Sequence, residues 1–129
     1  MLLFKKKFLP AIRTREKSQT IRLWNCCRMK TGQRSYIPGA GYIRVLAVEP
    51  VELTALTDED AVPDGFPTAA ALRNELATLY AEQLAAGHRA YRVCFELLSD
   101  EEQAAAVAAR RKAKARQTPS LGGTGASPV

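Results

Sequence analysis

The order of the strand-like and helical segments most constrains how this chain folds. Residues 20–24 (TIRLW), 42–53 (YIRVLAVEPVEL) and 88–98 (HRAYRVCFELL) are rich in β-branched and aromatic residues, a composition typical of strands. Helical patterns fill the stretch between the second and third of these segments. Because helices are segregated from strands, the sequence favours a small α+β domain or a partly closed β-barrel over a doubly wound sheet.

Helix boundaries are marked by capping residues. Thr57 precedes a run of acidic residues and predicts the start of a short helix, where the helix dipole favours negative charge. Thr68 predicts the start of a second helix that reaches about residue 86 and is ended by Gly87. Ser99 and Glu102 form a capping-box pattern at the start of an Ala-rich, charged final helix.

Two strand predictions are more specific. In the segment 42–53, Ile43, Val45 and Ala47 are expected on one face, and Pro50 marks an edge, a bulge or a bend. Residues 4–8 are interpreted as a short strand leading into a helix. Each of these expectations concerns local geometry that a structure tests directly.

The chain has 129 residues, the length of one domain. We expect a folded domain over residues 1–99, an Ala-rich charged helix over 100–116 and a disordered tail over 117–129. The tail is expected because its residues are mostly Gly, Ser, Thr and Pro, which bury little apolar surface.

Charge is strongly segregated along the chain, whose net charge is +6. Residues 1–34 contain ten basic residues and one acidic residue, and residues 110–129 contain five basic residues and no acidic one. Residues 35–109 contain four basic and twelve acidic residues. This pattern excludes an acidic solvating protein and is compatible with either a polyanion-binding surface or a set of solvated basic side chains.

Several features bear on location and cofactors. No apolar run approaches the roughly 18 residues of a membrane span, and the first residues lack the order of a secretory signal. The cysteines are three in number, and Cys26 and Cys27 are adjacent, so a disulfide framework is not expected. There is no CxxC, no glycine-rich phosphate loop and a single histidine. We therefore expect a cytoplasmic protein without membrane contact, metal or cofactor.

The densest polar segment covers residues 13–22 (RTREKSQTIR). If Thr20 begins a strand, Thr20 and Arg22 point to the same face, and Lys17 lies just before it. An ammonium, a hydroxyl and a guanidinium then converge, a set suited to a phosphate or to a carbonyl that gains negative charge. Crowding by Arg15 and Arg22 favours a neutral Lys17 that acts as a general base toward Thr20. A charged turn before an ordinary strand is the alternative.

Three further residues are candidates with structural alternatives. Asp64 precedes a glycine and is interpreted from local sequence as part of a turn. Trp24 and Tyr36 are candidates for stacking on nucleic-acid bases, although single aromatic residues in strands also serve as core. The basic cluster 110–116 suits either contact with phosphates or a solvated helix end.

An ordered series of motifs resembles the ASCH domain family. The opening motif is Lys17-x-x-Thr20-Ile21-Arg22, preceded by Phe8 and Ile12. It is followed by similar segments at residues 30–32, 43–52, 56–61, 64–66 and 91–97, so the resemblance covers about residues 2–98. Arg15 and Glu16 replace the usual Gly-Arg before the lysine.

The resemblance implies a fold and a set of functions. ASCH domains are similar to PUA domains, which are small β-barrels, here with two or three flanking helices, that have a cleft for RNA or a nucleoside. One branch contains amidohydrolases that remove the acetyl group of N4-acetylcytidine, and another member type has ribonuclease activity. By resemblance, Lys17 is the base, Thr20 the nucleophile, Asp64 falls at the family glutamate, and Arg22 holds an oxyanion or a phosphate.

Three function classes follow. The first is a module that binds RNA or a modified nucleoside in a basic cleft lined by Arg22, Arg15, Trp24 and Tyr36. The second is a hydrolase that uses Lys17 in the same cleft, either as an N4-acetylcytidine-type amidohydrolase or as a ribonuclease. The third is an interaction protein whose C-terminal helix docks a partner.

Overall fold

The computed structural model describes residues 2–124, with side chains through residue 116. The chain divides into two compact units, Met1–Leu97 and Leu98–Val129, which are described separately. The candidate site lies entirely within the first unit.

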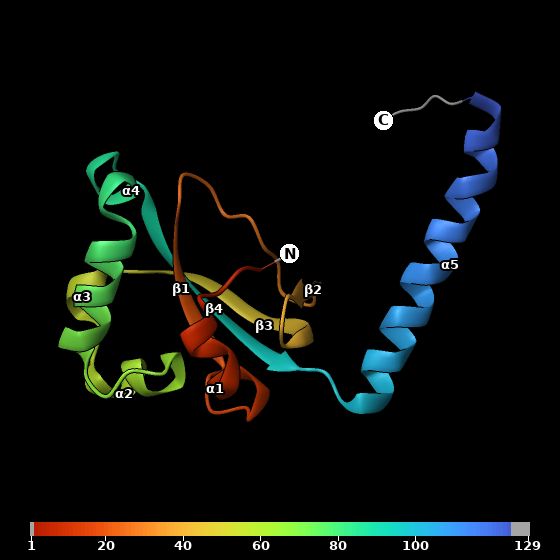
Figure 1. Cartoon of the computed structure of the whole chain (residues 1–129). Coiled ribbons are helices and arrows are strands. Elements are labelled where there is room, and N and C mark those ends of the chain that lie inside the picture. The colour runs from red at the N-terminus through yellow and green to blue at the C-terminus, as the bar shows by residue number, and fades with distance from the viewer. Residues whose placement is uncertain (1, 125–129) are drawn as a thin grey trace. The chain divides into compact units, whose positions relative to one another are not determined.

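The first unit is built on one antiparallel sheet (Figure 1). Its strands are β1 (Gln19–Trp24), β2 (Arg34–Ile37), β3 (Gly41–Val51) and β4 (Arg89–Leu97), in the order β1-β4-β3-β2. The sheet is curled into half of a barrel, with β1 and β2 as its two edges. The predicted α+β class is therefore confirmed. The short edge strand β2 was not predicted from the sequence.

A bulge in β3 corrects the predicted face alternation. Val45 pairs with Phe95 and the next pair is Ala47 with Cys94, so Leu46 has no partner residue in β4. The extra residue moves Ala47 to an exposed position, although Val45 is buried as expected. Beyond the bulge, Val48 packs against the core in place of Ala47.

Pro50 lies at an edge of the sheet, one of the three positions that the sequence predicted for it. Strand β3 pairs with β2 only along its first residues, and the last of these pairs is Arg44 with Arg34. Pro50 lies beyond them and pairs with β4 alone. The other side of β3 at Pro50 is therefore a free edge, where a missing backbone N–H breaks no ladder.

The strand predicted over residues 4–8 is wrong, because Phe4 and Lys5 have no regular secondary structure and the chain is helical from Lys6. A 3-10 turn η1 (Lys6–Phe8) leads into helix α1 (Leu9–Arg13). Pro10 stands in the first turn of α1, where its fixed φ and missing N–H suit a helix start. The proline therefore favours helix in a segment whose short apolar spacing was ambiguous.

The helical block between β3 and β4 begins as its caps predict. After η2 (Leu53–Ala55), Thr57 forms a capping box with Asp60 at the start of α2 (Asp58–Ala61). The 3-10 turn η3 (Val62–Asp64) follows, and the Thr68 hydroxyl accepts from a backbone N–H to cap α3 (Ala69–Leu79).

The helix predicted from Thr68 to about residue 86 is interrupted. It is divided into α3 and α4 (Ala81–Ala85) at Tyr80, whose φ and ψ are −119° and 29°. No proline or glycine accounts for this break, which places Tyr80 in the lining of the cavity described below. Gly87, at φ +80°, ends the block as expected.

Two apolar clusters form the core. The first joins α1 to β2, β3 and β4 and includes Ile12, Ile37, Ile43, Val45, Val93 and Phe95. The second joins β1 to α2 and α3 and includes Ile21, Leu23, Ala61, Ala69, Leu72 and Leu76. Phe8 packs against the first cluster and Phe66 against the second, with their rings 5.7 Å apart. The candidate site is lined by members of both sets.

The second unit is a helix, α5 (Asp100–Thr124). Ser99 and Glu102 make the predicted capping box, with the Glu102 N–H donating to Ser99 Oγ at 3.2 Å. The backbone helix continues past the predicted end at residue 116 and reaches Thr124, although Pro119, Gly122 and Gly123 disfavour helix. Residues 125–129 of the expected tail lie outside the described residues.

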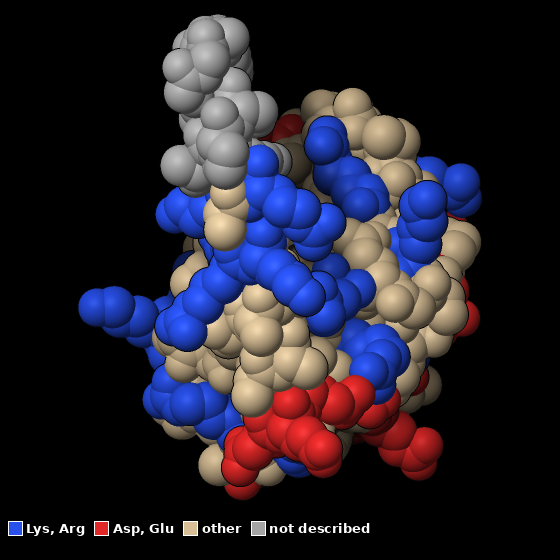
Figure 2. All heavy atoms as spheres, turned by 90° about the vertical axis from the view of Figure 1, so that its right-hand side faces the viewer, with Lys and Arg blue, Asp and Glu red and all other residues tan. Residues whose placement is uncertain are grey.

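Charge is divided along α5. Acidic side chains occupy its first turn, and the basic cluster 110–116 follows toward its C-terminal end. Figure 2 shows basic side chains gathered below the grey residues and an acidic group at the lower edge of the same face. The acidic first turn matches the positive end of the helix dipole, whereas the basic cluster lies before the last turn, which contains no basic residue. No helix among the described residues has both the length and the apolar character needed to cross a bilayer.

Candidate functional site

A cavity of about 330 Å³ lies in the first unit between the N-terminal segment, β1, η3 and α3. Aromatic and aliphatic side chains make up most of its lining, and charged and hydroxyl groups are inserted among them. The lining residues are Leu3, Phe4, Lys5, Phe8, Lys17, Thr20, Ile21, Arg22, Asp64, Phe66, Leu72, Glu75, Leu76, Leu79 and Tyr80. The cavity thus contains Lys17, Thr20, Arg22 and Asp64, four of the residues that sequence analysis singled out.

The Lys17–Asp64 ion pair is the most buried polar feature of the cavity. Lys17 Nζ lies 2.6 Å from Asp64 Oδ1, and the two side chains are only 2% and 4% exposed. The same ammonium also donates to the backbone carbonyl of Asp64. The two residues are 47 positions apart, so this contact depends on the tertiary fold.

Local backbone geometry directs both partners inward. After α1, Arg15 adopts a left-handed conformation with φ +69°, and the Lys17 N–H donates back to Ala11 O at 3.0 Å. A left-handed non-glycine residue is uncommon and costs free energy, which is typical of functional segments. Asp64 ends η3, and Gly65 follows it at φ +93°, where a side chain would be strained.

The charge state of Lys17 is set by opposing effects. Burial lowers its pKa below the ordinary value of 10.5, and the adjacent Asp64 carboxylate partly opposes this shift. The nearby Arg22 guanidinium adds to the lowering. The ammonium also lies 5.0 Å from the centre of the Phe8 ring and 6.0 Å from that of Phe66. Lys17 therefore releases its proton more readily than an exposed lysine.

Thr20 and Arg22 form the second polar pair. Both lie on β1 and line the cavity, as the strand periodicity predicted. Arg22 Nε donates to Thr20 Oγ1 at 3.2 Å, and Arg22 Nη2 donates to Leu3 O at 2.6 Å. The guanidinium carbon lies 4.6 Å from the centre of the Phe4 ring.

The contacts of Arg22 are with neutral groups, and burial lowers its pKa, an effect opposed by Tyr80 and Asp64. Thr20 Oγ1 acts as an acceptor from Arg22, so its own hydroxyl proton is not committed to that bond. No hydrogen bond joins Lys17 to Thr20 in the part of the chain described.

The other sequence candidates lie away from the cavity. Arg15 is exposed, and its Nη1 donates to Leu97 O at 2.5 Å. The Trp24 ring lies 5.6 Å from that of Tyr91, and the Tyr36 ring lies 5.0 Å from that of Tyr42. The structure therefore brings Lys17, Thr20, Arg22 and Asp64 together and places Arg15, Trp24 and Tyr36 elsewhere.

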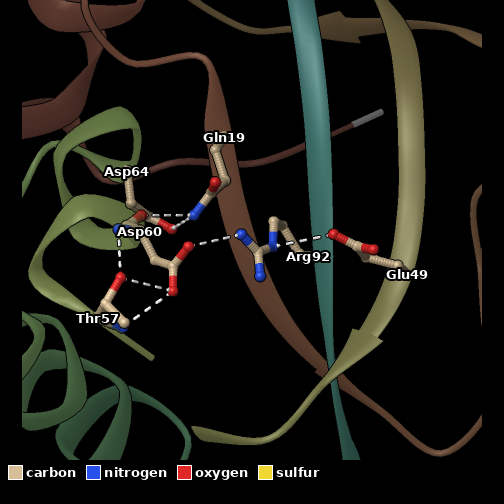
Figure 3. Close-up of polar contacts among 6 residues, drawn as sticks. All are labelled: Gln19, Glu49, Thr57, Asp60, Asp64 and Arg92. Atoms are coloured by element: carbon tan, nitrogen blue, oxygen red, sulfur yellow. Dashed lines mark hydrogen bonds and ion pairs between the residues drawn. The ribbon is translucent and has the colours of Figure 1, made fainter. Parts of the chain in front are cut away.

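Sequence analysis missed two groups of residues at this site. The aromatic walls come from Phe4, Phe8 and Phe66, which flank lysines or a glycine in the sequence, and from Tyr80. Tyr80 belongs to an apolar helical stripe that is equally typical of a core. Gln19 was also missed, although its amide contacts Asp64 (Figure 3). Its position directly before Thr20, within the densest polar segment, is the sequence signal that marks it.

Metal coordination has little support in this region. Among the side chains the structure describes, no group of three or more His, Cys, Asp and Glu residues is placed to hold a metal ion. The four candidate residues that line the cavity supply an amine, a hydroxyl, a guanidinium and a carboxylate.

Comparisons with known proteins identify the fold. No family model matches the chain, and no curated protein matches it. The hypothetical protein PH0355 is similar, with TM-score 0.62 and 14% identity over 74% of this chain and 95% of that chain. EF3133 from Enterococcus faecalis V583, described by the family model DUF984, has TM-score 0.58 and 17% identity over 71% of this chain and 70% of that chain. PF0455 from Pyrococcus furiosus has TM-score 0.57 and 18% identity over 75% of this chain and 94% of that chain. At these identities the likeness establishes the fold.

Proposed function

We propose that the first unit is an ASCH-like domain of PUA type whose cavity binds a modified nucleoside, either free or within RNA. The observation that carries this proposal is the meeting of the Lys17–Asp64 pair and the Thr20–Arg22 pair in one cavity with aromatic walls. The ordered motifs of the sequence support the family assignment, and the curled half-barrel sheet is compatible with it.

The cavity has the properties that a nucleobase requires. Its volume of about 330 Å³ is at the small end of the range for ligand pockets. The rings of Phe4, Phe8 and Phe66 offer flat apolar surface against which a base can stack. Thr20 and Arg22 supply hydrogen-bonding groups for base edges, carbonyls or phosphate oxygens.

Electrostatics favour an RNA context. Lys5 lies at the cavity wall, and Lys5 and Lys7 both contact Glu75 at 3.2 and 3.1 Å, leaving a net positive charge in this group. The basic cluster 110–116 is exposed along α5 and adds positive charge that favours a polyanionic ligand. Affinity for RNA should therefore fall steeply as salt concentration rises, because phosphate contacts release counterions.

Binding is tested by calorimetry with N4-acetylcytidine, cytidine and a short RNA, using Arg22→Lys and the matched variant Arg34→Lys. Arg34 is exposed and lies outside the cavity lining. Losing the planar guanidinium of Arg22 should weaken binding about tenfold, because a lysine does not reproduce its fork of donors. The Arg34 variant should match the wild type. Absence of binding of every ligand at low salt would contradict the proposal.

A hydrolytic activity is the second candidate, and the lowered pKa of the buried Lys17 favours it. In an N4-acyl substrate, the neutral Lys17 amine accepts the Thr20 hydroxyl proton while the oxygen attacks the acyl carbon. Arg22 stabilises the oxyanion, and the protonated Lys17 then protonates the departing amine. Water hydrolyses the threonine ester, releasing acetate and restoring the hydroxyl.

Cleavage of RNA is the alternative reaction in the same cavity. There Lys17 and Arg22 would stabilise the negative charge of the phosphorane, and the products would carry a cyclic or free phosphate. This candidate shares its binding residues with the acyl reaction and differs in its products.

Mass spectrometry of products separates these reactions. N4-acetylcytidine and total tRNA are incubated with wild type, Thr20→Ala and the control Thr78→Ala, whose threonine is exposed on α3. Acetyl loss that is abolished in the Thr20 variant and kept in the Thr78 variant would support the acyl mechanism. Equal turnover in the wild type and Thr20→Ala would refute Thr20 as nucleophile, and shortened RNA would indicate a nuclease.

A further inference from the structure

The buried amide of Gln19 contacts Asp64 (Figure 3), the residue whose other carboxylate oxygen meets Lys17. Gln19 is 4% exposed and stands at the first position of β1, immediately before Thr20. Its Nε2 donates to Asp60 O at 3.0 Å and to Asp64 Oδ2 at 3.3 Å. Both acceptors are oxygens without a hydrogen when Asp64 is ionised, so neither can donate a hydrogen bond to Gln19.

These bonds fix the orientation of the amide. Turning it over would place the Gln19 carbonyl oxygen against a backbone carbonyl and a carboxylate, which are both acceptors. The Asp64 carboxylate is then held at both ends, with Oδ1 on Lys17 at 2.6 Å and Oδ2 on Gln19. Its rotation about the side-chain bonds is constrained by two donors on opposite oxygens.

The position of the Asp60 carbonyl is fixed by a separate set of contacts (Figure 3). Asp60 Oδ2 accepts from the Thr57 backbone and hydroxyl at the start of α2. Asp60 Oδ1 lies 3.0 Å from Arg92 Nη1 on β4, and Arg92 Nε lies 3.3 Å from Glu49 on β3. The amide of Gln19 is therefore attached to a helix start that is itself tied to two strands.

We propose that Gln19 is a positioning residue of this cavity: it holds the Asp64 carboxylate in the orientation that meets Lys17, and so controls how Lys17 acts on the bound ligand. The inference rests on the proposed function, because it takes Lys17 as a group that acts on the ligand. Gln19 does not line the cavity itself, and its effect passes through Asp64.

Several charged or titratable groups surround this amide and bear on its pH dependence. They are Lys17, Arg22 on β1, Asp60 on α2, Asp64 on η3, Glu49 on β3, and Arg92 and Cys94 on β4, the last of which is the register partner of Gln19. Burial raises the pKa of the Cys94 thiol, so this group stays neutral around pH 7. A carboxylate introduced at position 19 meets the two acceptors of the present amide, the Asp60 backbone carbonyl and the negative Asp64 carboxylate.

The first test needs no ligand and measures the titration of the Lys17 side chain by NMR of its ε carbon. Gln19→Met keeps the length of the side chain but removes both donors, which frees Asp64 to turn away. The pKa of Lys17 should then fall by about one pH unit, because the nearby carboxylate is what opposes the effect of burial. Gln19→Glu should raise the pKa of Lys17, since it adds a negative charge. An unchanged Lys17 titration in the folded Gln19→Met protein would overturn the proposal.

The second test measures affinity for N4-acetylcytidine at pH 5 and pH 8. Gln19→Glu places two carboxyl groups against each other, and they share a proton only when the pH is low. Its affinity should be about tenfold below wild type at pH 8 and recover at pH 5, relative to wild type at each pH. Gln19→Met has no group at position 19 that can be protonated, so its affinity should stay below that of wild type at both pH values. Gln33→Glu, at an exposed glutamine, controls for added charge.

The outcomes separate the two proposals. If wild type binds no nucleoside while Gln19→Met shifts the Lys17 titration, the proposed function fails and the positioning role of Gln19 stands. If wild type binds and neither Gln19 variant changes the Lys17 titration or the pH dependence of affinity, the positioning role fails alone. Should Gln19→Met not fold, Gln19→Glu at pH 5 supplies the same decision, because recovery there requires a donor at this position.

Discussion

Replacing Asp64 by asparagine removes the negative charge that Lys17 contacts at 2.6 Å, with both side chains almost fully buried. Breaking a buried pair by neutralising one partner leaves an uncompensated charge and costs about 3–5 kcal/mol. Asparagine retains an oxygen that accepts from Lys17, so we expect the lower end, about 3 kcal/mol. For a domain of this size each kcal/mol lowers Tm by about 4–8 °C, which gives a fall of at least about 12 °C.

The loss depends on pH with a definite sign. The pKa of Lys17 in the folded protein is below its ordinary value of 10.5, so between these values the unfolded chain binds more protons than the folded one. Stability from this group therefore rises with pH across that window. Asp64→Asn removes an effect that raises the pKa of Lys17, so the pKa falls further and the window widens toward neutral pH. The cost of the substitution should be largest near neutral pH and shrink as pH approaches 10.

Urea denaturation between pH 6 and pH 10 measures this cost. Glu59→Gln, at an exposed carboxylate in the same helix block, is the matched control and should lie within about 0.5 kcal/mol of wild type. The double variant Lys17→Met with Asp64→Leu should recover most of the stability, because it leaves no buried charge. A destabilisation by Asp64→Asn that is independent of pH, or a double variant no more stable than Asp64→Asn, would refute the reasoning.

Three other substitutions or reactions test local features of the fold. Thr57→Ala removes the capping box of α2 and should lower the free energy of unfolding by about 1 kcal/mol in urea denaturation. An unchanged free energy of unfolding would show that the cap is dispensable. Gly39→Ala should cost about 1–2 kcal/mol or more, because φ is +88° and a Cβ there would lie 2.7 Å from Leu9. Cys94 should react with iodoacetamide more slowly at pH 8 than the exposed cysteines at 26–27, since burial raises its pKa; equal rates by mass spectrometry would contradict this.

Features set by neighbouring residues were predictable from the sequence. The strands β1, β3 and β4 follow from alternation of apolar residues, and the caps at Thr57, Thr68 and Gly87 follow from hydrogen bonds that span a few residues. The convergence of Thr20 and Arg22 follows in the same way, because positions two apart in a strand share a face. Local rules fail at the bulge in β3, where one additional residue reverses the alternation.

Features that depend on distant contacts were not accessible to local rules. The partner of Lys17 lies 47 residues away, and local sequence assigns Asp64 to a turn. The resemblance to a family drew attention to that position, and the fold brings it to Lys17. The role of Gln19 was hidden for the same reason, since both of its acceptors belong to the segment around α2. The left-handed backbone at Arg15 was not predictable either, because nothing in the local sequence indicates a positive φ at this residue.

The short side chain of Asp64 meets Lys17 because the Asp64 backbone also lies against the ammonium. The resemblance places a glutamate at this position, and aspartate is shorter by about one carbon–carbon bond. Here the Lys17 ammonium contacts both the carboxylate and the backbone carbonyl of Asp64, which requires the backbone itself to approach the amine. The turn η3, followed by Gly65 at φ +93°, brings that backbone close, and a Cβ on Gly65 would lie 3.7 Å from Lys17 Cδ. The Asp64 carboxylate thus meets Lys17 beside its own backbone carbonyl, and Gln19 holds its second oxygen there.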